Sequence, residues 1–431
     1  RDRSPSRGLG DVYKRQNINT KVSQDIDKIN KLGHKIHELN QQISKIEAGG
    51  IETAMDLRDE RDLALDQLGA LAKISYKEDY KGVVTVKLED EYFVDELHTY
   101  EIGKKTDKLT GFITPYWPQL SDTDRDIYVN VFDFNVDIST ALNSDVGELK
   151  ALIMSRGDHW ADYSDIEGKG EQEYLDTTNL SVIIDMQAKL DQMVHNMITA
   201  INDQLCPNVT GPVGVTYQDA NGNTVNLSDA KVLDTENCAR GSDGELPPRE
   251  LFVRAGIERY TEVTGSDGKT YYVYNEEDTS DTSYMYSLTS CGVNEELKKI
   301  ETLFPHLKQN GEVDQQLGER LEALWNKDLV GLDPTDPDEC NIEEYYQKMI
   351  GGLATVGNVY QKKAEDLAGS VLTIENNRQQ VIGVSSDEEL QNMIKFQNAY
   401  NASSRFMTVI SDMIEPVSYT HLRAHETDSY L

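Results

Sequence analysis

Apolar residues recur every seven positions between residues 18 and 46. One row of this repeat is Val22, Ile29, Ile36 and Ile43, and the other is Ile18, Leu32, Leu39 and Ile46, with Asp25 between them as the only polar member. Such a seam is typical of a helix that packs lengthwise against another helix. Gly49 and Gly50 end it. A second helix is expected over 56–73, antiparallel to the first, with Leu57, Leu65, Leu68 and Leu71 facing inward.

The period then changes from that of a helix to two, which predicts strands over 82–88, 91–94 and 126–136. Helices are expected again over about 140–156 and 178–205. The first of these places Leu149, Leu152 and Ile153 on one face. The second has a seam formed by Leu180, Val194 and Ile201 in one row and Ile183, Leu190 and Met197 in the other.

Residues 206–292 have the turn sequences of a β-rich insertion. NGN at 221–223 and GSDGK at 265–269 predict hairpin turns, and TYYVY at 270–274 predicts a strand. Helices are expected over about 294–327, 342–379 and 386–415. The last carries a stripe with near-heptad spacing, which consists of Met393, Phe396, Tyr400, Ser403, Met407, Ile410 and Ile414.

These elements predict a mainly helical α+β fold. We expect an elongated antiparallel helical bundle or coiled coil that carries a small sheet and a β-rich inserted domain. The expected divisions are a tail at 1–16, a first bundle part at 17–205 with its sheet at 77–138, the insertion at 206–292, a second bundle part at 293–385, a C-terminal axial helix at 386–415 and a tail at 416–431.

The two tails differ in character from the rest of the chain. Residues 1–16 are basic, and residues 417–431 interrupt a helical pattern and contain His421 and His425. Both resemble translated sequencing-adapter sequence, although a natural disordered arm and tail would look similar. We therefore leave both out of fold reasoning and assign neither histidine to a site.

Composition excludes several classes of function. Lys and Arg number 42 against 76 Asp and Glu, which gives a formal net charge of −34 at pH 7. A chain this acidic is repelled by nucleic-acid backbones and by anionic membrane surfaces. No run of 18 apolar residues and no apolar signal-peptide core is present, and the four cysteines are too few for a disulfide scaffold.

The chain contains none of the common catalytic or cofactor-binding motifs, such as a P-loop, a nucleophile elbow or a Rossmann fingerprint. His34 and His37 could share a helix face, but we interpret them as solvated residues beside the seam. The acidic run 122–133 lacks the Gly and Glu of a calcium loop. The acidic linker at 333–338 is given no metal role. We expect no enzyme activity, no metal and no cofactor.

The cysteines allow two interpretations from the sequence alone. Cys206, Cys238 and Cys291 belong to or border the insertion, and a pair among them would leave one thiol over. Unpaired thiols, including Cys340, fit the sequence equally well.

Three segments together carry a resemblance to a known family. They are DLRDERDLALDQLGALAKI at 56–74, GELKALIMSRGD at 147–158 and GVSSDEELQNMIKFQNAYNASSRFMTVISDMIE at 383–415. The chain resembles the bacterial flagellar hook-associated protein 1 family, whose members form the hook–filament junction. The third segment is similar to the C-terminal motif of flagellar rod, hook and junction proteins, with Ser386 where the family usually has Leu. The family's N-terminal region is absent, which indicates a fragment.

The resemblance implies a structural protein of motility that is secreted unfolded by flagellar type III export. It would form a homo-oligomeric ring at the hook tip, next to the hook protein and the second junction protein, after delivery by an export chaperone. Its place would be extracellular, on the flagellum.

We predict an assembly interface on the last helix. It consists of Met393, Phe396, Gln397, Tyr400, Asn401, Met407, Ile410 and Ile414, with the two amides setting register. The purified chain is expected to be a monomer whose last helix is loosely held. Alternatives are another axial protein, such as the second junction protein or a flagellin, and a surface enzyme or glycan-binding module in 206–292. A concave pocket with convergent carboxylates in the insertion would favour the module.

Overall fold

The computed structural model describes the backbone of residues 6–50, 53–133, 147–219, 222–382 and 386–427, and side chains within 14–50, 53–133, 147–219, 222–380 and 387–413. The chain divides into two units, Arg1–Leu353 and Ala354–Leu431. The boundary falls inside one helix, so neither unit coincides with a division expected from the sequence. Those expected divisions stay a prediction.

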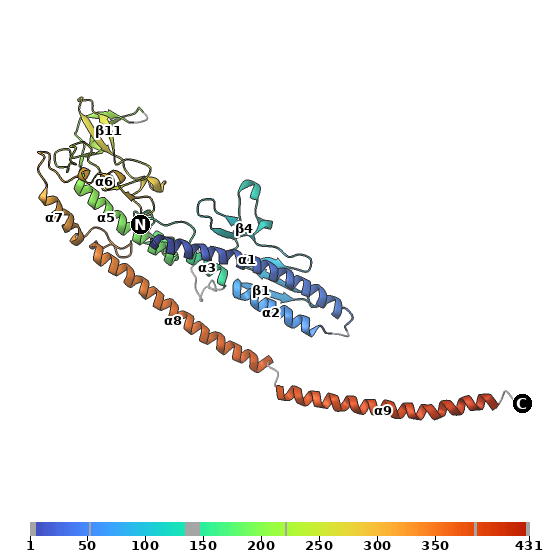
Figure 1. Cartoon of the computed structure of the whole chain (residues 1–431). Helices are drawn as coiled ribbons and strands as arrows, with labels where there is room; N and C mark the ends of the chain where they lie inside the picture. Colours follow the sequence, from blue (N-terminus) through green and yellow to red (C-terminus); the bar gives the residue numbers. More distant parts are fainter. Residues whose placement is uncertain (1–5, 51–52, 134–146, 220–221, 383–385, 428–431) are drawn as a thin grey trace. The chain divides into compact units, whose positions relative to one another are not determined.

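Helices of very different lengths make up about half of the described chain (Figure 1). They are α1 Ser6–Glu47, α2 Met55–Leu71, α3 Glu148–Arg156, α4 Glu171–Asp176, α5 Val182–Leu205, α6 Glu295–Lys299, α7 Gln315–Ala323, α8 Ile342–Ile382 and α9 Ser386–Thr427. In the first unit, α2 runs alongside α1, as the short loop between the two seams predicts (Figure 1).

The strands are short and form small antiparallel sheets. They are β1 Ile74–Glu78, β2 Val84–Leu88, β3 Glu91–Val94, β4 Gly103–Thr106, β5 Ile113–Tyr116, β6 Asn208–Thr210, β7 Thr216–Gln218, β8 Thr224–Asn226, β9 Lys231–Leu233, β10 Phe252–Val253, β11 Tyr260–Thr264, β12 Thr270–Tyr274 and β13 Gly292–Val293. The sheet orders are β1-β2-β3, β4-β5, β7-β8, β10-β13 and β11-β12-β9-β6. The predicted mixed α+β class is confirmed.

The seam of α1 forms the main core of the first unit. Val22, Ile29, Ile36 and Ile43 are fully buried, and Leu32 and Leu39 are nearly so. They pack with Leu65, Leu68 and Leu71 of α2, with β2 and β3, and with Leu149 and Ile153 of α3. Ile46 is the exception among the seam residues, because it lies in the last turn of α1 and is 42% exposed.

Three asparagines of α1 fasten extended segments to this core. Asn40 Nδ2 donates to Val84 O at 2.8 Å while Val84 N donates to Asn40 Oδ1 at 3.1 Å. Asn30 makes the same pair of bonds with Ile102, at 3.0 and 2.8 Å. Asn19 donates to Gly111 O and accepts from Ile113 N. Each amide thus satisfies an acceptor and a donor of the main chain, which α1 could not reach with its own backbone.

Close approach explains one glycine of α1. A Cβ on Gly33 would lie 2.7 Å from the Phe93 ring, so only glycine allows β3 to pack its buried phenylalanine directly on the helix. The sheet β1-β2-β3 therefore sits against the middle of α1, between the positions of Asn30 and Asn40.

Several sequence predictions about these elements are wrong. Residues 126–133 form no strand, because they pair only through isolated bridges, Ile127 with Asp122 of the preceding turn and Asn130 with Tyr116 at the end of β5. The expected helix over 294–327 is broken into α6 and α7 by a looped segment. β1, β4 and β5 were not predicted at all. Residues 134–136 and 140–146 of the expected elements lie outside the described residues.

The helix ends also differ from the expectation. α1 begins at Ser6, upstream of the expected start at Ile18, and Arg15 in this segment is fully buried. Its guanidinium lies 4.9 Å from the centre of the Trp160 ring and donates to Gln187 Oε1 at 3.1 Å. At the other end, α9 continues to Thr427, so the expected break near residue 417 is wrong. Whether the two tails are foreign to the protein stays a prediction.

The expected seam of α5 is only partly correct. Its six members are half-buried, whereas Ile184, Ala188 and Ile198 are buried together with the polar Asp191 and Asn202. The reason is that α5 is packed from several sides, by α3, α7 and the turns around residues 163 and 178. A two-row seam describes a helix with one partner and fails for a helix with several.

Candidate assembly surface

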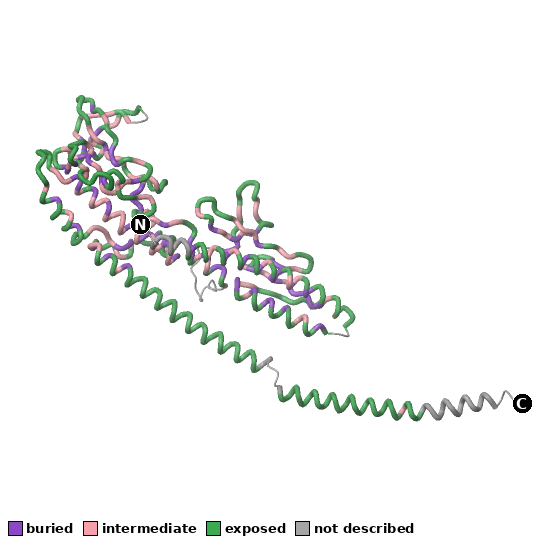
Figure 2. Tube along the Cα trace, viewed as in Figure 1, coloured by how far each residue is buried: buried purple, intermediate pink, exposed green. Residues whose placement is uncertain are grey.

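The predicted interface lies on α9, in the second unit. Its apolar members are strongly exposed: Met393 by 54%, Phe396 by 74%, Tyr400 by 75% and Met407 by 67%. Ile410 is half-buried. Within the described side chains of 354–380 and 387–413, Ile410 is the only one that is not exposed. Figure 2 shows that α8 and α9 are exposed along nearly all of this length. The side chain of Ile414 lies outside the described residues.

The two amides of the predicted interface lie beside the stripe. Gln397 directly follows Phe396, and Asn401 directly follows Tyr400. One residue turns a helix by roughly 100°, so both amides stand at the edge of the apolar stripe. The asparagines of α1 have the same placement, because Asn19, Asn30 and Asn40 each follow a seam residue directly. The placement of the amides therefore suits them to bond a partner that covers the stripe.

A second exposed stripe, on α8, was missed by the sequence analysis. Tyr360, Leu367 and Ile374 recur at seven-residue intervals and are exposed by 58%, 55% and 66%. Ala364 and Val371 fill the alternate row between them. The signal was present as heptad spacing, but several small or polar residues interrupt it. The second unit therefore carries two helices with exposed heptad stripes.

The first turns of α8 are buried in the first unit. Tyr345 is 1% exposed and Met349 is 4% exposed. The Tyr345 hydroxyl lies 2.9 Å from both Lys189 O and Gln192 Oε1 of α5. The same helix thus begins inside a core and continues with every described side chain exposed.

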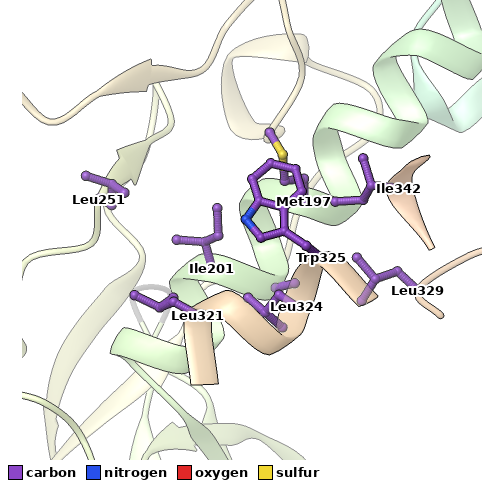
Figure 3. A pocket seen from close by; sticks show the side chains of 9 residues that line it. Met197, Ile201, Leu251, Leu321, Leu324, Trp325, Leu329 and Ile342 are labelled. Atoms are coloured by element: carbon purple, nitrogen blue, oxygen red, sulfur yellow. The ribbon is translucent and has the colours of Figure 1, made fainter. Parts of the chain in front are cut away.

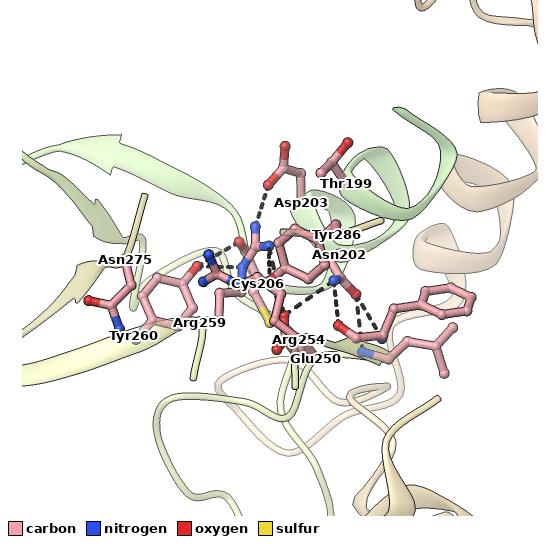
Figure 4. A network of polar contacts seen from close by, with 12 residues as sticks. Thr199, Asn202, Asp203, Cys206, Glu250, Arg254, Arg259, Tyr260, Asn275 and Tyr286 are labelled. Atoms are coloured by element: carbon pink, nitrogen blue, oxygen red, sulfur yellow. Dashed lines mark hydrogen bonds and ion pairs between the residues drawn. The ribbon is translucent and has the colours of Figure 1, made fainter. Parts of the chain in front are cut away.

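A buried polar network joins the end of α5 to the β-rich part (Figure 4). Asn202 Nδ2 donates to Phe252 O at 2.8 Å and to Glu250 Oε2 at 3.2 Å. The Tyr286 hydroxyl donates to the same Glu250 oxygen at 2.5 Å. Arg259 contacts Asp203 and Tyr286. Burial raises the pKa of Glu250 to about 7, against the opposing effects of the Tyr286 hydrogen bond and the Arg259 charge.

An apolar pocket lies between α5 and α7 (Figure 3). It has a volume of about 160 Å³, and its lining includes Met197, Ile201, Leu321 and Trp325. Leu251 is the only lining residue from the β-rich insertion, and none of the lining side chains is titratable. The pocket therefore lacks the convergent carboxylates that would have favoured a catalytic or glycan-binding module.

The other sequence candidates for chemistry lie apart. His34 Nε2 is 2.7 Å from Glu101 Oε1, and His37 Nδ1 is 3.3 Å from Asp95 O, so the two rings bond different loops. Asp122 caps a short turn by accepting from Arg125 N. Within the described residues, no group of three or more possible ligands could hold a metal ion. Nor is any described helix both long and apolar enough to cross a bilayer.

Two segments of the chain match known protein families. Residues 13–224 match the family model of the flagellar hook-associated protein FlgK helical domain. Residues 379–417, which include the α9 stripe, match the C-terminal model of the flagellar basal body rod FlgEFG proteins. The chain is a FlgK-like protein.

Two individual proteins are also similar to this FlgK-like chain. Flagellar hook-associated protein 1 of Bacillus subtilis is 22% identical over 421 residues, which cover 93% of this chain and 65% of the relative. The structure of the flagellar hook junction protein FlgK from Burkholderia pseudomallei has a TM-score of 0.45 at 13% identity and covers 88% of this chain and 87% of that one. The FlgK-like chain thus spans about two thirds of the length of its curated relative.

Proposed function

We propose that this chain is a structural subunit of the hook–filament junction of the bacterial flagellum. It assembles at the hook tip as a ring of identical copies, between the hook protein and the second junction protein. Support comes from the FlgK helical-domain match and from the similarity to hook-associated protein 1. The observation that carries the proposal is the exposed apolar stripe of α9, inside the segment that matches axial flagellar proteins.

Physical chemistry supports an assembly role for this stripe. Burying a large apolar side chain stabilises a complex by about 1.5–3 kcal/mol, so a stripe of this length leaves a considerable driving force unused in the single chain. A helix without tertiary contacts is marginal in water. α9 is therefore stabilised when helices of neighbouring subunits cover its apolar stripe, which consists of Met393, Phe396, Tyr400, Met407, Ile410 and Ile414. Gln397 and Asn401, at the edge of the stripe, fix the register of the contact.

The location follows from the proposed role. The chain leaves the cell unfolded through the flagellar type III channel, guided by an export chaperone, and works on the extracellular flagellum. Helices whose apolar faces are buried only by neighbouring copies are suited to this export route. The entropic cost of ordering them is offset at assembly, when those faces become buried.

The decisive experiment changes the stripe in the full-length protein within a flagellated bacterium. Replacing Phe396 and Tyr400 by Ala should abolish filament attachment, since these two rings are the aromatic members of the stripe and are exposed by 74% and 75%. Filaments per cell, motility and junction assembly are counted by electron microscopy and swimming assays. Secretion into the medium is measured alongside, so that loss of assembly is separated from loss of export.

A matched control uses the opposite face of the same helix. Ile394 and Val409 are exposed by 52% and 53% and lie on the side of α9 away from the stripe. The Ile394→Ala, Val409→Ala double change also truncates two exposed apolar side chains of α9 and should leave filaments attached. Normal junction assembly by the Phe396→Ala, Tyr400→Ala protein would overturn the proposal.

A further inference from the structure

Two buried cysteines lie at the point where α5 enters the β-rich part. Cys206 directly follows the last residue of α5 and is fully buried, and Cys238 is 2% exposed. Both belong to one apolar cluster with Leu205, Leu233 and Tyr260. Both are free thiols in this structure.

Main-chain hydrogen bonds hold the segment of Cys238 against that of Cys206. Asp234 N donates to Pro207 O at 2.9 Å, and Ala239 N donates to Leu205 O at 3.2 Å. The two acceptor residues, Leu205 and Pro207, lie on either side of Cys206. Ala239, which donates to Leu205 O, directly follows Cys238. A disulfide needs Cα atoms about 4.4–6.8 Å apart, and each cysteine directly adjoins one partner of the Ala239–Leu205 bond. Burial raises the pKa of Cys206, and negative charge at Cys238 adds to this rise.

We propose that Cys206 and Cys238 form a disulfide that fastens the end of α5 to the turn after β9. The oxidant is a small disulfide such as oxidised glutathione. The thiolate of one cysteine attacks a sulfur atom of oxidised glutathione, which forms a mixed disulfide and releases one glutathione thiolate. The second cysteine then attacks the mixed disulfide and releases the other, so that the protein loses two protons and two electrons and one glutathione disulfide becomes two thiols.

The bond closes while the chain folds. Burial raises the pKa of both thiols, so the reactive thiolate is scarce once this core has formed. Exposures of 0% and 2% also exclude a glutathione-sized oxidant from the folded core. Before the core is complete both thiols are accessible, and the hydrogen bonds above then bring them together. Once closed, the bond is protected from reductants by the same burial.

The two other cysteines lie elsewhere and serve as internal controls. Cys340 is also 2% exposed, but it packs in a separate cluster with Tyr345 and Met349. Its Sγ lies 3.6 Å from Val330 O, much as Cys206 Sγ lies 3.6 Å from Pro248 O. Cys291 is half-buried and lies in neither cluster.

The test refolds the full chain in a buffer of reduced and oxidised glutathione, alkylates the remaining thiols and digests the protein with trypsin. Cleavage after Lys189, Lys231 and Arg240 puts Cys206 and Cys238 on separate peptides. Mass spectrometry should find these two peptides linked, with Cys291 and Cys340 alkylated. Reduction of the linked protein should lower its Tm by about 5 °C.

Variants decide whether the pairing is specific. The linked peptide should survive Cys340→Ser and disappear in Cys238→Ser. The wild-type peptide map needs no variant, so a misfolded variant does not weaken the test. Alkylation of Cys206 and Cys238 in the refolded wild-type chain, or equal pairing of Cys206 with Cys291 or Cys340, would overturn the proposal.

Discussion

The helices α1 and α9 carry the same kind of apolar pattern, but this pattern is buried in α1 and exposed in α9. In α1 the seam residues Val22, Ile29 and Ile36 are fully buried, whereas Phe396 and Tyr400 of α9 are about three-quarters exposed. The difference lies in the rest of the chain. α2, α3 and the β1-β2-β3 sheet cover α1, and Asn40 bonds β2 to it. A heptad pattern thus specifies which face of a helix is apolar. Other segments of the chain, or other subunits, determine what covers that face.

The largest expected contrast between the two helices is in hydrogen exchange. Amides in the middle of α1 open only when the core of the first unit unfolds, whereas those of α9 are held by the helix alone. We expect exchange to be slower by at least about 10⁴-fold around Ile29 than around Phe396, measured by mass spectrometry on the purified chain. Equal protection of the 387–413 segment would show that the single chain already buries the stripe.

A truncation in each seam sharpens the comparison. Ile36→Ala should lower the free energy of unfolding of the first unit by about 3 kcal/mol, because it leaves a cavity at a fully buried site. Phe396→Ala should change it by less than about 0.5 kcal/mol. Urea unfolding followed by tryptophan fluorescence measures both, since Trp117, Trp160 and Trp325 all lie in the first unit. A large effect of Phe396→Ala would contradict the independence of the two stripes.

The asparagine contacts of α1 provide a smaller test. Asn40→Ala leaves the buried N–H and C=O of Val84 without their partner and should cost about 2–3 kcal/mol. Asn30 is only half-buried, so Asn30→Ala should cost less. Gln41→Ala, at an exposed position next to Asn40, is the control and should stay within about 0.5 kcal/mol. Equal costs for all three changes would argue against a specific role of the amides.

The smallest effect concerns pH, through a buried carboxyl group in the first unit that has no counterpart on the exposed helix face. Folding raises the pKa of Glu250 from its ordinary value to about 7, so the folded state binds the extra proton between about pH 4.5 and 7. The stability that Glu250 contributes is therefore complete below about pH 4.5 and is lost as the pH rises from there through about 7. Glu250→Gln should remove this dependence in urea titrations at several pH values. The exposed Glu262→Gln should leave it unchanged.

The groups around Glu250 set the direction of this effect. Tyr286, Arg259 and Arg254 favour its charged form and Glu258 opposes it, but burial outweighs them. A rise in stability between pH 5 and 8 that depends on Glu250 would show that the arginines dominate instead.

Long periodic elements could be predicted from the sequence because local spacing alone reveals them. The seam of α1, the inner face of α2 and strand β12 are confirmed. The stripe of α9 was found in the same way, although its role stays a prediction. The strand expected from residue 126 onward was wrong over its described part, 126–133, because alternation also occurs in a segment held by isolated bridges. The α8 stripe was missed because the small residues Gly357 and Ala364 stand in its alternate row.

The sequence by itself determined that helices with apolar seams form, that a β-rich part interrupts them, and that the chain resembles hook-associated proteins. Only the tertiary structure decided which seams are filled, where Asn19, Asn30 and Asn40 bond the main chain, and that Cys206 and Cys238 share a core. The physical reason is the distance along the chain over which each interaction acts. Helical periodicity arises within a few residues, whereas burial and amide–backbone bonds depend on segments tens of residues away along the chain.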